Sequence, residues 1–290
     1  MSTHPSTAPT LPEHAPTLPE HAPRAPRTSA WRTVHAGAMI AAADFRAMYT
    51  WTTWTFGWLA RMLSQAVFFA LVGKVFSSPG GERYLFVGNA LMACAIEAML
   101  VITSSAWERR SATLPLLVAS PAELAWVFVG RSLQWIPSGI ATSTTTLLVL
   151  GPFFGVHWTV PGAAAMVCLV ALTAVGTYCF GLFLSALALS ATTWRNTISN
   201  VAYLGMMAIC GVEVPVSVWP TAVRWVAWSL PLTHDLLALR GVLDGAPVGT
   251  VLLRVLLGTA TALAWLALAL PAFGRVAASG RRSGTLESTG

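Results

Sequence analysis

The chain has 290 residues, of which 55% are hydrophobic and only 10% are charged, and its mean hydropathy is +0.65. A soluble domain carries about 25% charged residues because charge keeps its surface hydrated. This composition therefore excludes an ordinary soluble globule and predicts that lipid surrounds most of the chain. The net charge of +6 does not indicate nucleic acid as a partner, because the basic residues are distributed as membrane orientation predicts.

Residues 1–30 are predicted to be a disordered tail. They repeat the heptapeptide TLPEHAP at Thr10–Pro16 and Thr17–Pro23, and prolines at this density stop helix and strand propagation. The next segment, 31–50, predicts an amphipathic helix in the cytoplasmic interface, because apolar side chains recur there at three- and four-residue steps. These side chains are Trp31, Val34, Ala38, Ala41, Phe45 and Met48.

Six apolar segments are predicted to cross the membrane as helices, since a span takes about 20 mostly apolar residues. They are 54–76, 84–106, 128–150, 162–190, 197–213 and 249–273, and the fifth is the shortest. None shows the period-two alternation of a transmembrane β-strand. The sequence therefore predicts an all-α polytopic membrane protein, with a flexible cytoplasmic tail at 276–290.

Lys and Arg residues set the predicted orientation, because they are enriched in cytoplasmic loops. With a cytoplasmic N-terminus, eleven lie inside: Arg24, Arg27, Arg32, Arg46, Arg109, Arg110, Arg131, Arg195, Arg275, Arg281 and Arg282. Five lie outside or at that margin: Lys74, Arg83, Arg224, Arg240 and Arg254, and Arg61 lies within the first span. Both termini are thus expected in the cytosol, with the protein in the plasma membrane.

The cytoplasmic connection from Trp107 to Arg131 is too long for a tight turn. Ser120, Pro121 and Glu123 predict a helix start, with Ser as N-cap, Pro at the first helical position and Glu at the third. Leu114 and Leu117 belong to a short apolar face before it. A helix parallel to the membrane and a simple structured loop both fit this segment.

Two charged residues fall within predicted spans. Arg61 is roughly 10 Å above the cytoplasmic start of its helix, and Glu97 is roughly 14 Å above the cytoplasmic end of the next. An unpaired charge at such depth costs about 3 kcal/mol on insertion scales. We expect the two to pair or to share water in a pathway. The alternative is that Arg61 extends to the headgroups and Glu97 is protonated.

The sequence contains no sign of catalytic, metal or cofactor chemistry. It has no GxxxxGK[ST] loop to bind ATP, so the energy for any transport must come from a partner or an ion gradient. The four cysteines form no CxxC pair, and they predict packing residues without a disulfide or metal. His157 and His234 both fall in predicted outer loops, whereas an intramembrane enzyme needs catalytic groups deep in its spans.

Two ordered segments resemble ABC-2 type transporter permeases. The first comprises Glu108, Thr113, Leu114, Leu117, Ser120, Pro121 and Gly130-Arg131, which follow the family pattern E-x3-GTLE-x-L-x2-SP with GR some ten residues later. Here Ala112 replaces the usual Gly and Pro115 the usual acid. The second runs from Gly211 through Arg240, with Pro215, Pro220, Pro231 and Arg240 in the expected order.

This resemblance implies an exporter membrane domain at 31–275 that partners a separate ATP-binding subunit and a second permease, identical or homologous. It assigns coupling to the ATPase to Glu108, Arg109, Thr113, Leu114, Leu117, Ser120 and Pro121. It also implies that residues 213–245 form a re-entrant outer gate before the last span, with Pro215, Pro220, Pro231 and Arg240. On physical grounds alone, 213–245 can also be an interfacial loop, because each of its apolar stretches is too short to span the membrane.

A small hydrophobic or amphiphilic compound, such as a drug or natural product, is the expected substrate. Export of a lipid-linked glycan is an alternative. An ion-coupled secondary carrier is another, although such carriers commonly place several acids in their spans and Glu97 is the only acid well inside a predicted span.

Overall fold

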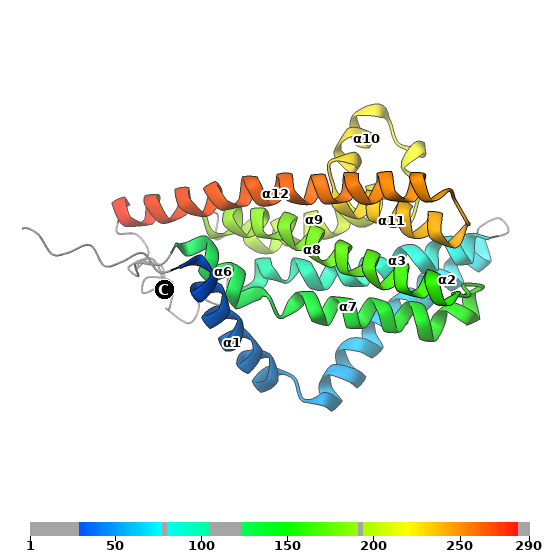
Figure 1. The fold of residues 1–290 in the computed structure, drawn as a ribbon, viewed down its shortest axis with the longest axis horizontal. Coiled ribbons are helices and arrows are strands. Elements are labelled where there is room, and N and C mark those ends of the chain that lie inside the picture. Colours follow the sequence, from blue (N-terminus) through cyan, green and yellow to red (C-terminus); the bar gives the residue numbers. More distant parts are fainter. Residues whose placement is uncertain (1–28, 77–79, 105–122, 191–193, 284–290) are drawn as a thin grey trace, which may run out of the picture.

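The computed structural model describes residues 29–76, 80–104, 123–190 and 194–283, and every regular element among them is helical, as predicted (Figure 1). In chain order these are α1 (Ala30–Met48), the π-helix η1 (Thr53–Leu59), α2 (Ala60–Phe76), α3 (Gly81–Met99), α6 (Leu124–Ser132), α7 (Trp135–Thr145), the π-helix η2 (Thr146–Leu150), the 3-10 helix η3 (Gly151–Phe154), α8 (Val160–Ser190), α9 (Arg195–Ile209), the 3-10 helix η5 (Val216–Val218), α10 (Thr221–Trp228), α11 (Pro231–Leu243) and α12 (Val248–Ser283).

Four helical segments of the described residues are long and apolar enough to cross a membrane. They are Thr53–Phe76, Gly81–Ser104, Val160–Leu189 and Val248–Ser279. The other two predicted spans correspond to shorter helices, so helix length does not establish six crossings. Around 128–150 the chain turns between α6 and α7 at Leu133 and Gln134, where Pro137 provides no N–H for a helical bond to the Leu133 carbonyl. Helix α9 has only 15 residues.

The last helix, α12, is longer than the predicted span. It extends to Ser283, whereas the sequence predicted a span ending at 273 and a flexible tail from 276. Residues such as Ala277 and Ala278 favour helix, and Ala277 is buried, so packing continues beyond the apolar run.

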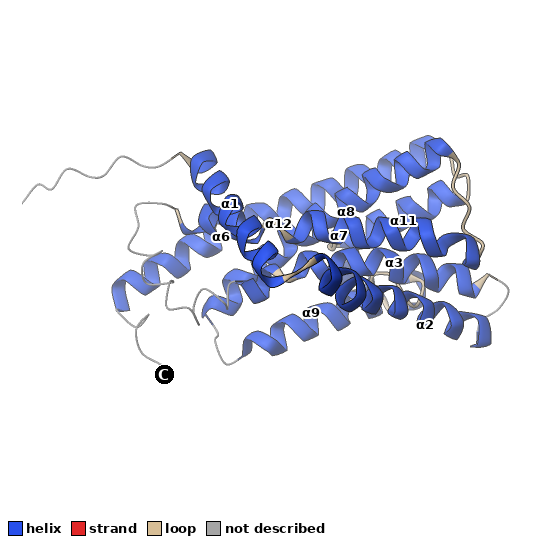
Figure 2. Cartoon of the chain, turned by 90° about the horizontal axis from the view of Figure 1, so that it is seen from below, coloured by secondary structure: helices blue, strands red, loops and turns tan. Residues whose placement is uncertain are grey.

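Helix α3 forms the centre of the bundle. It packs against α2, α7 and α8, and α12 packs along α8 and α11 (Figures 1 and 2). Nearly every side chain from Leu85 to Met99 is buried, so α3 is covered by protein on all sides.

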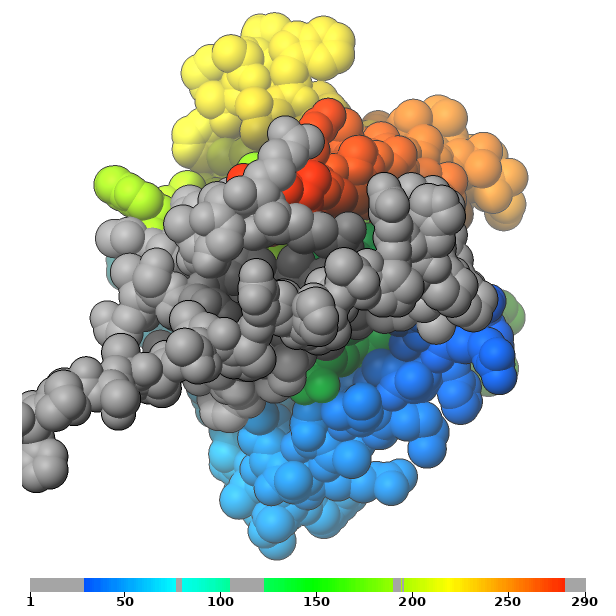
Figure 3. All heavy atoms as spheres, turned by 90° about the vertical axis from the view of Figure 1, so that its left-hand side faces the viewer, coloured from blue at the N-terminus to red at the C-terminus, as the bar shows by residue number. Residues whose placement is uncertain are grey.

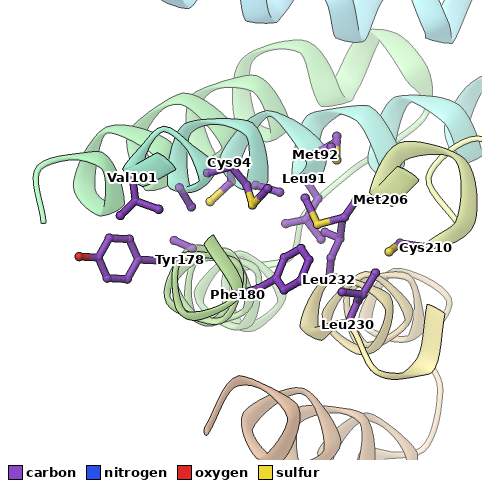
Figure 4. Packing of buried hydrophobic residues seen from close by; sticks show 14 of the residues in the cluster. Leu91, Met92, Cys94, Val101, Tyr178, Phe180, Met206, Cys210, Leu230 and Leu232 are labelled. Atoms are coloured by element: carbon purple, nitrogen blue, oxygen red, sulfur yellow. The ribbon is translucent and has the colours of Figure 1, made fainter. Parts of the chain in front are cut away.

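Buried apolar side chains from several helices meet at one core, part of which is drawn in Figure 4. Leu91 of α3, Phe180 of α8, Met206 of α9 and Leu232 of α11 belong to it. The core therefore fixes α11 to the long helices, although α11 is itself only 13 residues long.

Two parts of the chain project from the bundle in opposite directions. The α1–η1 corner stands out on one side and α10 on the other, as Figure 3 shows from the end of the bundle that carries α6. We name this end the α6 end and the opposite one, where α11 and the start of α3 lie, the α11 end. Both projections expose large apolar side chains, including Trp51 and Trp225.

Candidate transport machinery

At the α6 end, α1 and α6 touch through their backbones. A Cβ added to Gly37 would lie 2.9 Å from the Cα of Gly130, and one added to Gly130 would lie 2.7 Å from the Val34 carbonyl oxygen. Asp44 of α1 forms an ion pair with Arg131 of α6, at 3.4 Å. The predicted helix at 31–50 is confirmed as α1, but its packed face centres on Gly37 and Ala41, and Trp31 is exposed.

The connection that leads into α6 holds the predicted coupling residues. Glu108, Arg109, Thr113, Leu114, Leu117, Ser120 and Pro121 lie outside the described residues. What the structure does place is the base of this connection, because α6 begins at Leu124 and is held against α1 by the Gly37–Gly130 contact.

The prolines of the predicted outer gate each precede or begin a short helix. Pro215 comes directly before η5, Pro220 directly before α10, and Pro231 is the first residue of α11, where its missing N–H costs no helical hydrogen bond. The Thr233 hydroxyl donates to the Ala227 carbonyl at 2.6 Å. Together these features fold residues 213–245 into the short η5 and the helices α10 and α11, with a tight corner between α10 and α11.

Arg240 ties this segment to the start of α3. Its guanidinium lies 3.5 Å from the centre of the Tyr84 ring and donates to the Tyr84 carbonyl at 3.1 Å. It also donates at 2.8 Å to the carbonyl of Gly211, which accepts a second 2.8 Å bond from the Tyr84 hydroxyl. Gly211 has a φ of +89°, a conformation that favours glycine. We name Tyr84, Gly211 and Arg240 the outer network.

A pocket of about 210 Å³ lies beside the outer network. It is lined by Gly80, Arg83, Tyr84, Val87, Arg240, Leu243 and Asp244. Arg83 forms an ion pair with Asp244 across it, at 3.1 Å, and both side chains are partly exposed. The pocket therefore carries two guanidinium groups but only one directly paired carboxylate.

Arg61 and Glu97 do not form an ion pair in the part of the chain that the structure describes, so the expected direct contact is absent there. Arg61 is on the exposed face of α2, with its guanidinium 5.6 Å from the centre of the Trp58 ring. Glu97 is 0% exposed. The Arg61 guanidinium thus packs over the ring of Trp58, one turn earlier in the chain.

Polar and aromatic groups from η1 and α7 surround the Glu97 carboxylate. The hydroxyls of Ser138 and Thr142 and the indole N–H of Trp58 face it, and the Trp54 indole donates to the Ser138 hydroxyl at 3.2 Å. We name these five residues the Glu97 cluster. Nearby, burial first and the Glu97 carboxylate second raise the pKa of the Tyr49 phenol at the end of α1, which keeps that phenol neutral.

Asp235 is a second buried acid, and it was not singled out in the sequence within the predicted gate at 213–245. It is 0% exposed, and neither carboxylate oxygen has a hydrogen-bond partner within the described residues. One of these oxygens packs directly against Gly258 of α12. A signal was present in the sequence, because Leu232, Leu236 and Leu239 share a helical face with Asp235.

Comparison with known proteins identifies the family. The family model for the ABC-2 type transporter matches residues 39–243, well over half of the chain. No curated protein matches the chain. The matched region contains the Asp44–Arg131 ion pair, the Glu97 cluster and the outer network, and it agrees with the resemblance seen in the sequence. The chain therefore belongs to the ABC-2 type transporter family.

Proposed function

We propose that this chain is the non-catalytic membrane subunit of an ATP-driven exporter in the plasma membrane. It crosses the membrane six times, pairs with a second permease copy or a homologue, and is driven by a separate ATP-binding subunit. Family membership carries this proposal, and the absence of a phosphate-binding loop from the sequence supports the division of labour.

The packing of α6 supports a coupling role for the connection before it. Force applied to this connection reaches α6, and the Gly37–Gly130 contact transmits it to α1 because the two backbones touch. Glu108 and Pro121 then belong to the docking surface for the ATPase. The Lys and Arg distribution supports a cytoplasmic position for the α6 end.

Residues 213–245 close the outer end of the path as a re-entrant segment. Irregular backbone at membrane depth is tolerated where protein covers it, and α11 meets this condition because it is buried against α3, α8 and α12. The outer network holds the segment to α3, and the exposed α10 faces lipid or the second permease.

Co-purification with the ATP-binding subunit tests the proposal. We expect a stable complex whose ATP hydrolysis depends on the permease and is altered by Glu108→Gln or Pro121→Ala. A correctly folded chain that never associates with an ATP-binding subunit would contradict the proposal.

Asp235 favours one second candidate, an ion-coupled carrier. With Glu97 it makes two buried acids among the membrane helices, where ionisable residues commonly mark proton relays. Transport into proteoliposomes separates the candidates. An imposed pH gradient without ATP would drive uptake by a carrier, whereas an ATP-driven exporter stays inactive until the ATPase and ATP are added.

A further inference from the structure

We propose that the Glu97 cluster binds the positively charged group of a hydrophobic organic cation, so that the exported substrate is a cationic amphiphile. This inference rests on the proposed export function and names the chemical class of its substrate. The cluster is defined by Glu97 of α3, Trp54 and Trp58 of η1, and Ser138 and Thr142 of α7.

The first argument is the isolation of the carboxylate. Glu97 is 0% exposed, and both oxygens lack a hydrogen-bond partner within the described residues. No protein cation pairs with it there, because the Arg61 guanidinium lies on the Trp58 ring. An anion in an apolar setting is strongly destabilised unless a counter-charge is nearby. A bound cation supplies that counter-charge.

The second argument is that two of the polar atoms around Glu97 are also unpartnered. The Trp58 indole nitrogen and the Thr142 hydroxyl are buried and make no hydrogen bond in the described part of the chain. Natural proteins leave few buried polar groups unpaired, and those that remain require an explanation. Here they converge on one carboxylate from two different helices, which is the pattern of a binding site.

The third argument is the aromatic surface on the same side. The Tyr49 and Trp58 ring centres are 6.4 Å apart, and Trp54 lies one turn before Trp58. The Trp58 ring already accepts a guanidinium at 5.6 Å. Aromatic faces beside a carboxylate are the chemistry by which proteins recognise ammonium and other organic cations.

The position of η1 explains how a membrane-dissolved compound reaches the cluster. None of the seven η1 residues is buried, whereas α3 behind it is almost completely buried. π-helical segments recur at functional sites. The indoles of η1 thus lie between the carboxylate and the outside of the bundle.

Two isosteric ions provide the test. Tetraphenylphosphonium and tetraphenylborate have similar size and hydrophobicity but opposite charge, and neither titrates. Equilibrium binding of each is measured to the purified full-length chain in lipid nanodiscs. We expect Glu97→Gln to weaken tetraphenylphosphonium binding at least tenfold, with Glu97→Asp within threefold of the wild type. Tetraphenylborate affinity should not fall in Glu97→Gln.

Matched control variants show whether binding depends on the Glu97 cluster or on any acid or indole of the chain. Glu82 is an acid on the same helix but at its half-buried start, so Glu82→Gln should leave binding unchanged. Trp58→Leu should weaken tetraphenylphosphonium at least threefold, whereas Trp225→Leu, which changes an exposed indole of α10, should not. Trp58→Leu also keeps the test decisive if Glu97→Gln fails to fold.

Wild-type affinity for tetraphenylphosphonium in both Glu97→Gln and Trp58→Leu would overturn the proposal, as would an equal loss of both ions. Binding requires no ATPase, so the result is independent of co-purification. Suppose that the chain recruits its ATPase but that Glu97→Gln binds tetraphenylphosphonium as tightly as the wild type. The proposed export function then stands, and only the proposed substrate class is rejected.

Discussion

The two ends of this permease are held together in different ways. At the α11 end, Arg240, Tyr84 and Gly211 form a polar network in which each carbonyl and guanidinium is bonded within one chain. At the α6 end, α1 meets α6 through a glycine contact and a partly exposed ion pair, and the Tyr178 hydroxyl of α8 donates to the Val129 carbonyl of α6 at 2.9 Å. The α11 end is therefore joined by a polar network, whereas α1 and α6 meet at the α6 end by direct backbone contact.

This difference fits the separate tasks that we propose for the two ends. A gate must keep its closed form without help from another subunit, so its interactions are internal. A coupling surface must pass on movement from another subunit, so its helices touch closely. Substitutions at the α11 end should therefore reduce stability more than coupling. Substitutions at the α6 end should reduce coupling more than stability.

The largest stability loss is expected for Arg240→Met. The change removes two hydrogen bonds from a charged donor, each of which contributes about 1.5–3 kcal/mol, together with the contact on the Tyr84 ring. We expect a loss of about 3 kcal/mol, measured by thermal unfolding in detergent. The matched control is Arg83→Met, because the partly exposed Arg83–Asp244 pair should contribute no more than about 1 kcal/mol. Equal losses would mean that the outer network does not hold the segment.

A smaller loss is expected for Gly130→Ala. The added methyl group would lie 2.7 Å from the Val34 carbonyl oxygen, so α1 must move away from α6, at a cost of about 1–3 kcal/mol. Permease-stimulated ATP hydrolysis should fall more steeply than the melting temperature. The control is Gly205→Ala in α9, where an added Cβ meets nothing within 4 Å. Unchanged hydrolysis in Gly130→Ala would exclude this contact from coupling.

Asp44→Asn should have a weaker effect. It removes the 3.4 Å ion pair with Arg131, but Asp44 is more than half exposed, and exposed pairs contribute about 0–1 kcal/mol. Thermal unfolding at low and high salt checks this prediction, since screening should reduce the difference between variant and wild type. A difference that grows with salt would show that Asp44 acts by some means other than its charge.

The smallest change in stability is expected for Glu108→Gln and Pro121→Ala. Surface substitutions usually alter stability by no more than about 0.5 kcal/mol, so membrane insertion and melting should match the wild type. Transport should nevertheless decrease, because these residues are proposed to contact the ATPase. Normal transport in both variants would remove them from the coupling surface.

Much of the architecture could be predicted from local patterns. The low charge content and the long apolar runs predicted a helical membrane protein. Pro215, Pro220 and Pro231, which the family resemblance assigned to the outer gate, stand at the starts of the short helices before α12. These features depend on composition and on backbone constraints within a few residues. They are present in the sequence whatever the helices later contact.

Only the tertiary structure decided which residues meet. Asp235 was not singled out in the sequence, and it is buried because α8 and α12 pack around α11. Arg61 and Glu97 have comparable predicted depth, yet depth does not specify direction around a helix axis, and Trp58 receives the guanidinium. The composition and the long apolar runs therefore determined a helical membrane protein. Side-chain partners depended on helix rotation and packing, which arise from contacts between residues far apart in the chain.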